Sequence, residues 1–290
     1  MILLTGATGL VGRELLPLLL DSGQRVRVLV RDPRRLGANR VRVQIALGDL
    51  ADPFSLRHAM RGVETVIHLA ATIRDQPRGT IEELNGLATL RLLQGAERAG
   101  VERFVFFSAL GASSIQRTRF FRTKALAEKA VGDSDLDSTV FAPSIVYAPG
   151  DPWVSLMERL ANLPLLPIAG SGDANYQPIC SRDVATCVAA ALNGAGGEPR
   201  YELAGPDTLS YDEIAAIVAR AAGRSRPLFH VPEPVVRASL RAAELVAGDK
   251  VFATYEEAEL MEVPMTTPRG TEDAESLGVT PVPMSRVLQH

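Results

Sequence analysis

Three evenly spaced glycines near the start of the chain, Gly6, Gly9 and Gly12, constrain its fold most. They follow an apolar run at residues 2–4 and precede a leucine-rich helical pattern that ends at residues 21–23. In a strand–loop–helix unit, such glycines permit a tight turn, backbone approach to a pyrophosphate, and close helix–sheet packing. A triplet alone also suits a plain turn, but its flanks favour a dinucleotide site. The expected contact residues are Gly6, Thr8, Gly9, Leu10, Val11 and Gly12.

A second strand, predicted over residues 25–30, ends where the nucleotide type is usually selected. Arg31 comes first, followed by Asp32 and, close behind, Arg35. An acidic residue here binds the ribose hydroxyls of NAD, whereas a basic residue accommodates the 2′-phosphate of NADP. Because guanidinium geometry matches phosphate, we predict NADP, bound by Arg31 and Arg35, with NAD less favoured. A solvated basic loop, or NAD selected through Asp32, remains the alternative.

Further strands alternate with helices along the next hundred residues. The predicted strands cover residues 41–46, 65–71, 103–107 and 139–141, and the predicted helices cover 53–61, 81–99 and 119–131. This alternation predicts an α/β protein with a Rossmann doubly wound parallel sheet. At its carboxyl edge, Asp49 and Leu50 are expected near the adenine, although Asp49 serves equally well as a turn cap. The small Ala70 and Ala71 would let a cofactor lie against the backbone.

Composition and charge exclude several other classes of protein. The net charge of −3 lacks the basic bias of nucleic-acid binders. Apolar runs stop short of the ~20 residues that a membrane span needs, and no cationic segment precedes one, so the expected compartment is the cytoplasm. The four histidines lack metal-ligand spacing, and Cys180 and Cys187 form no Cys-x-x-Cys pair, so we predict no metal site.

Motifs beyond the glycine loop point to a known family. They are Gly48-Asp49-Leu50, His68-Leu69-Ala70-Ala71, Asn85 near its helix start, and the segment Pro143–Asp151. Together they resemble the extended and atypical short-chain dehydrogenase/reductases. The stretches at residues 29–32 and 122–128 look most like the NmrA-like branch and the nucleotide-binding accessory subunit of complex I. The resemblance, which runs through most of the chain, implies that Asn85 belongs to the cofactor site and that Pro143 and Ile145 pass beneath the nicotinamide.

The chain departs from the catalytic pair of that superfamily, Tyr-x-x-x-Lys. The corresponding positions hold Phe120 and Lys124. In the family the tyrosine supplies a proton and the lysine lowers its pKa while gripping the ribose; phenylalanine has no proton to exchange. Lys124 is expected to bind ribose, with a solvated helix lysine as the alternative. Ser108 lies near the family's helper serine, although Ala109 aligns equally well.

Two units are expected. Residues 1–150 would form the NAD(P)-binding Rossmann domain, with 179–205 returning to it, and residues 151–178 and 206–290 would form a small helix-rich C-terminal substrate lobe. Prolines and glycines mark irregular connections after residue 150. The resemblance implies the return to the main sheet, with a late strand near residues 201–206.

These features support three functional hypotheses. The first is an NADP-dependent oxidoreductase acting on a quinone-like or conjugated carbonyl acceptor, because such acceptors take hydride without a tyrosine proton. The second is a non-catalytic NADP-binding sensor or assembly protein. The third, a nucleotide-sugar epimerase or dehydratase, depends more heavily on the missing tyrosine. The expected partners are the dinucleotide and a small-molecule substrate, without nucleic acid, and a homo-oligomer is compatible with the sequence.

Overall fold

A seven-stranded parallel sheet forms the centre of the molecule. The structure, a computed structural model, describes residues 1–247 and 254–289; residues 248–253 and 290, which belong to the predicted lobe, lie outside the described residues. The strand order is β11-β6-β5-β4-β1-β2-β3. The strands are β1 (Ile2–Thr5), β2 (Val26–Val30), β3 (Gln44–Leu47), β4 (Thr65–His68), β5 (Arg103–Phe107), β6 (Asp137–Pro143) and β11 (Arg200–Leu203). Because the order reverses direction at β1 and β4, a ligand crevice is expected at the carboxyl ends of these strands.

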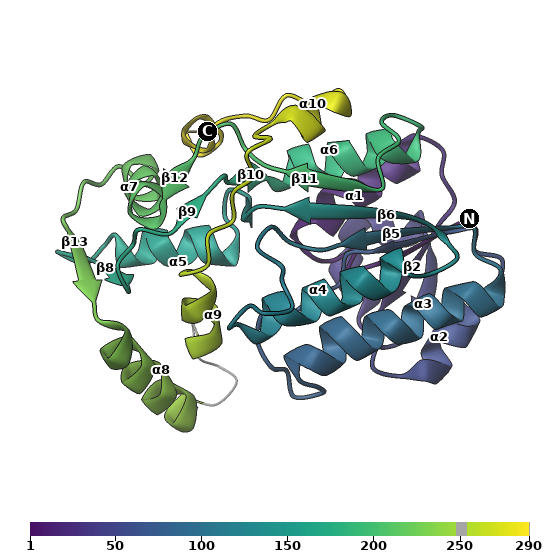
Figure 1. Cartoon of the computed structure of the whole chain (residues 1–290), viewed down its shortest axis with the longest axis horizontal. Coiled ribbons are helices and arrows are strands. Elements are labelled where there is room, and N and C mark those ends of the chain that lie inside the picture. The colour runs from purple at the N-terminus through teal and green to yellow at the C-terminus, as the bar shows by residue number, and fades with distance from the viewer. Residues whose placement is uncertain (248–253, 290) are drawn as a thin grey trace.

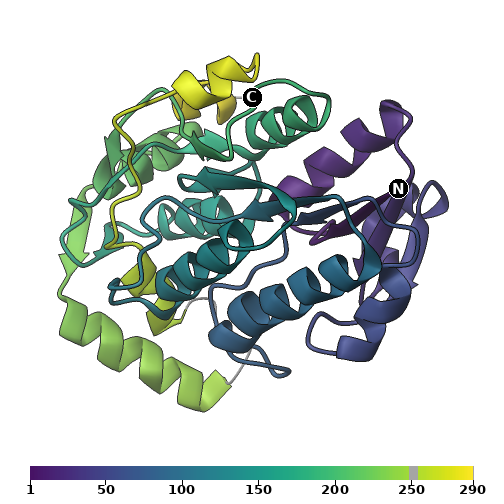
Figure 2. The same cartoon turned by 45° about the vertical axis from the view of Figure 1, so that its right-hand side comes forward.

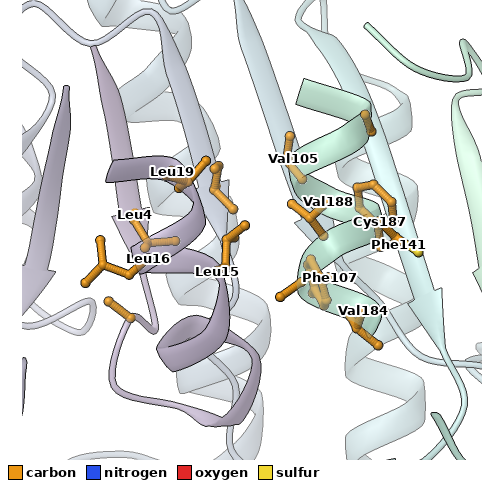
Figure 3. Packing of buried hydrophobic residues seen from close by; sticks show 14 of the residues in the cluster. Leu4, Leu15, Leu16, Leu19, Val105, Phe107, Phe141, Val184, Cys187 and Val188 are labelled. Atoms are coloured by element: carbon orange, nitrogen blue, oxygen red, sulfur yellow. The ribbon is translucent and has the colours of Figure 1, made fainter. Parts of the chain in front are cut away.

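Helices cover both faces of the sheet, which confirms the predicted doubly wound α/β fold (Figure 1). One face is covered by α1 (Leu10–Asp21) and α6 (Ser181–Leu192), and the other by α2 (Pro53–Ala59), α3 (Ala88–Ala99) and α4 (Arg119–Gly132). Figure 3 shows Leu15, Leu16 and Leu19 of α1 facing the sheet, in the same buried cluster as Val184 and Val188 of α6. Their helical spacing is the pattern that predicts a core-facing helix.

The remaining elements build a second buried cluster around Tyr147 and Tyr176. Its helices are α5 (Pro152–Leu160), α7 (Tyr211–Ala221), α9 (Tyr255–Leu260) and α11 (Met284–Val287), and α8 (Glu233–Ala247) packs against α9. Short strands pair here as β7 (Val146–Tyr147) with β10 (Ile179–Cys180), β9 (Asn175–Tyr176) with β12 (Leu209–Ser210), and β8 (Leu166–Ala169) with β13 (Leu228–Val231). The cluster combines residues from the predicted substrate lobe with residues before 151, such as Phe121 and Tyr147, and the division into two units stays a prediction.

The C-terminal segment crosses between the two clusters. Figure 2 shows the chain after α9 running along the edge of the molecule to α10 (Glu272–Ser276). Asp273 of α10 is buried, and its Oδ2 accepts a hydrogen bond from the backbone N of Glu202 in β11 at 2.6 Å. Ala274 and Leu277 join the core cluster of the sheet. In the division that we propose, the segment with α10 therefore accompanies the Rossmann unit, although the sequence suggested the lobe for all of residues 206–290.

Three predicted elements differ from the structure. Residues 33–41 form 3₁₀ turns, Pro33–Val41, which are interrupted at Gly37, where φ is +57°, and the Asp32 carboxylate caps the first turn; the third strand therefore occupies Gln44–Leu47 instead of 41–46. The predicted helix 81–99 starts as a π-helix, Glu82–Leu87, before continuing as α3. Within the returning segment, β11 joins the main sheet as expected, whereas β10 pairs with β7 outside it.

Candidate dinucleotide site

The glycine loop joins β1 to α1, and its glycines have distinct steric roles. Gly6 has φ +76°, and a Cβ there would lie 2.6 Å from the backbone N of Ala70. A Cβ on Gly12 would lie 2.2 Å from the Gly6 carbonyl oxygen. A Cβ on Gly9, which is exposed, would meet only the Gly6 oxygen, at 3.2 Å. Gly6 and Gly12 are thus required by internal packing, while the space over Gly9 is open to a ligand.

The start of α1 is suited to bind an anion. Gly9 is the N-cap residue, and no side chain of the described residues caps this end of the helix. The first N–H groups of α1, which include those of Leu10 and Val11, have no partner within the helix and lie at the positive end of its dipole. Thr8 lies half-buried in the same loop. An open glycine loop followed by an uncapped helix start fits a pyrophosphate group.

The arginine and aspartate side chains that follow β2 differ in their availability to a ligand. The side chains of Arg31 and Arg35 are exposed, and neither guanidinium makes a hydrogen bond or ion pair with the described residues, although the backbone N of Arg35 donates to the Asp32 carbonyl oxygen at 3.2 Å. The carboxylate of Asp32 is engaged, because its Oδ1 accepts a hydrogen bond from the backbone N of Arg34 at 3.0 Å. The guanidinium groups are therefore available to an added phosphate, whereas Asp32 already stabilises the start of the 3₁₀ helix.

Residues from two other strand ends lie at the same edge of the sheet. Asp49 follows β3, and its Oδ1 accepts from the backbone N of Ala51 at 3.1 Å, as the turn-cap alternative requires. Its Oδ2 lies 3.5 Å from Arg78. Leu50 packs partly against the core cluster under α2 and α3. After β4, Ala70 is half-buried against Gly6 and Ala71 is exposed, so the backbone at this point is accessible.

Asn85 secures the loop that follows β4. It lies buried in the π-helix, and its Oδ1 accepts from the backbone N of Thr72 at 2.9 Å while its Nδ2 donates to the Thr72 carbonyl oxygen at 2.7 Å. The side chain is thus occupied by the protein itself. Single-turn π-helices occur frequently at functional sites. Thr72 was not among the residues predicted from the sequence.

Lys124 is buried, which excludes the solvated alternative. Its Nζ donates to the Phe107 carbonyl oxygen at 2.6 Å and lies 4.9 Å from the ring centroid of Phe106. The ring of Phe120 is 5.9 Å from the same atom, so the helix brings the two positions together as predicted. Burial lowers the pKa of Lys124 to about 7, only partly offset by Glu128.

Ser108 and the end of β6 complete this side of the site. Ser108 lies directly after β5; within the described residues its buried Oγ has no hydrogen-bond partner, which leaves it available to a ligand. Pro143 is buried at the end of β6, and its carbonyl oxygen accepts from the backbone N of Leu110 at 2.9 Å. Ile145 is half-buried, and its carbonyl oxygen accepts from Ile179 at 3.0 Å. These contacts fix the backbone beside Ser108.

A known protein family matches the part of the chain that includes the glycine loop. Residues 6–194 match the model of a family described as NAD(P)H-binding, which covers more than half of the chain. The chain belongs to the atypical short-chain dehydrogenase/reductases. It is therefore a member of an NAD(P)H-binding, oxidoreductase-type family, and the predicted resemblance is confirmed.

The relatives of this family member include enzymes and subunits of larger assemblies. The chain is 31% identical to a (4-alkanoyl-5-oxo-2,5-dihydrofuran-3-yl)methyl phosphate reductase of Streptomyces griseus, over 84% of this chain and 86% of that protein. It is 30% identical to subunit 9 of the NADH dehydrogenase [ubiquinone] 1 alpha subcomplex, a mitochondrial protein of Arabidopsis thaliana, over 85% of this chain and 64% of that protein. The chain thus spans less than two thirds of the plant subunit.

Solved structures agree on the fold. An NADPH-dependent quinone oxidoreductase of Escherichia coli, in complex with NADPH, superposes with a TM-score of 0.74 at 20% identity, covering 100% of this chain and 99% of that one. A nucleoside-diphosphate-sugar epimerase of Staphylococcus aureus gives a TM-score of 0.79 at 20% identity, with 100% and 99% coverage. At these identities the likeness establishes the fold alone.

Across residues 1–247 and 254–289, no group of three or more His, Cys, Asp or Glu side chains is arranged to hold a metal ion. Within the same ranges, none of the helices combines the length and the apolar character of a membrane span.

Proposed function

We propose that this chain is an NADP-dependent reductase that delivers hydride to a quinone-like or conjugated carbonyl acceptor. The observation that carries the proposal is Phe120 beside the buried Lys124, because the position of the usual proton donor holds a side chain without an exchangeable proton. A positioned general acid typically contributes ~10²- to 10⁴-fold. Reactions of simple ketones and alcohols would lack this general acid. A conjugated acceptor, by contrast, delocalises the negative charge that hydride addition creates.

Reduced nicotinamide supplies the hydride when it is bound. Addition of hydride to the β-carbon of an enone moves the alkene electron pair toward the carbonyl oxygen, and the resulting enolate takes a proton from water at the α-carbon. The chain holds and orients the reactants. In this proposal the glycine loop and the start of α1 bind the pyrophosphate, Lys124 binds the ribose, and Pro143 and Ile145 support the nicotinamide.

The assignment of NADP rests on the unequal availability of Arg31 and Asp32. Arg31 is exposed and unpaired among the described residues, whereas the Asp32 carboxylate accepts from Arg34 N. A 2′-phosphate would find free guanidinium groups, including that of Arg35. Ribose hydroxyls, by contrast, would compete with an existing helix cap for Asp32.

Several relatives are named as reductases, and one of them acts on a conjugated carbonyl compound. The substrate named for the Streptomyces griseus relative is a 5-oxo-2,5-dihydrofuran with a 4-alkanoyl group, in which the ring C=C is conjugated with carbonyl groups. A ceramide reductase of Caulobacter vibrioides is 28% identical over 80% of this chain, and an NAD(P)H azoreductase of Xenophilus azovorans is 29% identical over 77%. Transfer of their reaction class to this chain is part of the proposal.

Oxidation of NADPH, followed by its absorbance, tests the reaction. Enones, quinones and azo compounds form one panel, and secondary alcohols with NADP form the other. We expect turnover in the first panel alone. Efficient alcohol dehydrogenation would contradict the mechanism.

A second candidate is a non-catalytic NADP-binding protein. It is favoured by the absence of a proton donor at Phe120 and by relatives such as the photosystem II assembly factor Ycf39 of Synechocystis, 25% identical over 81% of this chain. Tight NADPH binding without turnover in either panel would support it. The epimerase alternative is supported by a similar fold alone, and the chain lacks the tyrosine on which that chemistry depends.

A further inference from the structure

A chain of buried hydrogen bonds links the glycine loop to the π-helix through His68. The Thr5 Oγ1 lies 2.7 Å from Nδ1 of His68, and Nε2 of His68 lies 2.9 Å from Oγ1 of Thr89. The Thr89 hydroxyl in turn donates to the Asn85 carbonyl oxygen. Thr5, His68, Thr89 and Asn85 are all at most 1% exposed. Thr5 directly precedes Gly6, and it is paired with His68 in the register of β1 and β4.

The order of donors in this chain determines where the imidazole proton lies. A carbonyl oxygen can only accept, so the single hydroxyl proton of Thr89 is used on Asn85. Thr89 Oγ1 must then accept from His68, which places a proton on Nε2. In a neutral ring Nδ1 is left as an acceptor for the Thr5 hydroxyl. Every donor in the chain thus points from the glycine loop toward the π-helix.

The surroundings of His68 keep its ring neutral. Burial, and secondarily the nearby positive charge of Lys124, lower the pKa of His68 to about 3. Its other neighbours are the rings of Phe104 and Phe106, at 6.5 and 6.0 Å between centroids. A neutral histidine therefore lies near the titratable ammonium group of Lys124.

The same row of hydrogen bonds extends, through the Asn85 side chain, to the loop after β4. The Asn85 side chain makes two hydrogen bonds to the backbone of Thr72, four residues beyond His68. The loop between them is therefore held at both ends, and its Ala70 packs against Gly6. Residues 70–72 form the wall that the proposed dinucleotide site requires.

We propose that His68 is a positioning residue for the dinucleotide, acting as a neutral Nε2–H imidazole that fixes the wall at residues 70–72 against the glycine loop. It neither touches substrate nor transfers a proton. The proposal rests on the proposed function, since that function supplies the dinucleotide. The competing explanation, a histidine that merely fills the core, requires neither a particular tautomer nor an effect on cofactor affinity.

Nitrogen-15 NMR of the labelled full-length protein tests the tautomer directly. The His68 signals, assigned by their loss in His68→Phe, should report one protonated nitrogen, Nε2, unchanged between pH 6 and 8. A ring protonated on Nδ1, or on both nitrogens in this range, would overturn the proposal.

Cofactor affinity tests the positioning role. Thr89→Val removes the hydroxyl without changing the shape of the side chain, and Thr89→Ser restores it. One lost hydrogen bond in the wall should raise the Kd for NADPH about three- to tenfold in Thr89→Val and His68→Phe, with recovery in Thr89→Ser. Thr186→Val is the matched control, because Thr186 makes the same bond to the carbonyl four residues earlier, at 2.8 Å, on α6; its Kd should equal that of wild type.

The outcomes separate this proposal from the proposed function. Equal NADPH affinity in wild type and in folded Thr89→Val would overturn the role of His68 and leave the proposed function intact. A wild-type protein that binds no dinucleotide would overturn both. An affinity loss in Thr89→Val that Thr89→Ser recovers supports the positioning role.

Discussion

The guanidinium of Arg119 makes a bidentate pair with the carboxylate of Glu82: Nε lies 2.7 Å from Oε1 and Nη2 lies 2.5 Å from Oε2. Arg119 opens α4, the helix of Phe120 and Lys124, whereas Glu82 opens the π-helix of Asn85. Asp75 and, at 3.5 Å, Glu256 of α9 share the same guanidinium. One arginine of α4 thus contacts carboxylates from three other segments, namely the loop with Asp75, the π-helix and α9.

Replacement of Arg119 by Met should lower stability in a salt-dependent manner. The groups are partly exposed, so we expect a loss of about 1 kcal/mol, larger at low ionic strength than in 1 M salt. Melting curves at two salt concentrations measure it, with Lys129→Met as the control, since the ion pair that Lys129 makes with the described residues is with exposed Asp133. Equal losses at both salt concentrations would contradict an ionic role.

The same pair gives Glu82 a distinct pH dependence. The hydrogen bond from Arg119 lowers the pKa of Glu82 from 4.5 to about 2. Its contribution to stability is therefore present above about pH 4.5 and is lost as the pH falls toward 2. Denaturant unfolding of wild type and Glu82→Gln should differ at pH 6 and converge at low pH; a constant difference would contradict the pairing.

Cofactor preference should depend on Arg31. In Arg31→Ala the Kd for NADPH should rise at least about tenfold, equivalent to about 1.4 kcal/mol, while that for NADH stays unchanged. Titration calorimetry with both dinucleotides measures this, and Arg98→Ala, an exposed arginine in α3, is the control. A preference that survives in Arg31→Ala would remove this residue from the 2′-phosphate site.

Adding a methyl group should mainly affect cofactor affinity at Gly9 and mainly affect stability at Gly12. Gly9→Ala should fold with a stability change below about 1 kcal/mol yet bind NADPH on the order of tenfold more weakly, because its Cβ meets only the Gly6 oxygen, at 3.2 Å, and otherwise occupies the space proposed for the ligand. Gly12→Ala should lose about 1–3 kcal/mol of stability, since its Cβ meets the Gly6 oxygen at 2.2 Å. Thermal melts and binding curves on both variants distinguish them, and the reverse order would refute the assignment.

Lys124 should impose a pH dependence at neutral to alkaline pH. Its pKa is about 7 in the folded protein and returns toward 10.5 on unfolding. Between these values the unfolded chain binds one more proton, so the unfolding free energy should rise by about 1.4 kcal/mol per pH unit relative to Lys124→Met. Urea unfolding of both proteins from pH 6 to 10 measures the difference. A flat difference would mean that the ammonium stays charged.

A phenol at position 120 should restore the missing acid. Phe120→Tyr places a hydroxyl one helical turn from Lys124, whose Nζ already lies 5.9 Å from the Phe120 ring. We expect simple ketone reduction to rise by about tenfold or more, because a positioned acid contributes up to ~10⁴-fold. Steady-state rates with ketones and enones decide it, with Phe121→Tyr as the control on the neighbouring ring. No gain in a folded variant would weaken the proposed cause of the acceptor preference.

The fold could be predicted because its periodicity is local. Leucines at helical spacing define α1, and apolar runs define strands such as Thr65–His68. The edge strand β3 begins three residues later and ends one residue later than predicted, because apolar residues here, such as Ile45 and Leu47, are exposed and their apolar character does not reflect burial. Val41, also apolar, is 88% exposed.

The site could be predicted only as far as motifs extend. The glycine loop and Lys124 follow from spacing, but the contact between Asn85 of the π-helix and Thr72, thirteen residues away, follows from no local pattern. The sequence contains one sign of the hydrogen bonds through His68, because Thr5 and His68 are polar residues that end apolar strands. Only the strand register places them together.

The hydrogen bond from Glu202 to Asp273 has a consequence for solubility. As an outer strand, β11 presents backbone groups that could pair with a strand of another molecule, and α10 occupies part of that edge. The C-terminal segment thus shields the sheet against edge-to-edge aggregation. A chain shortened before Thr267 would expose a ready template for intermolecular pairing.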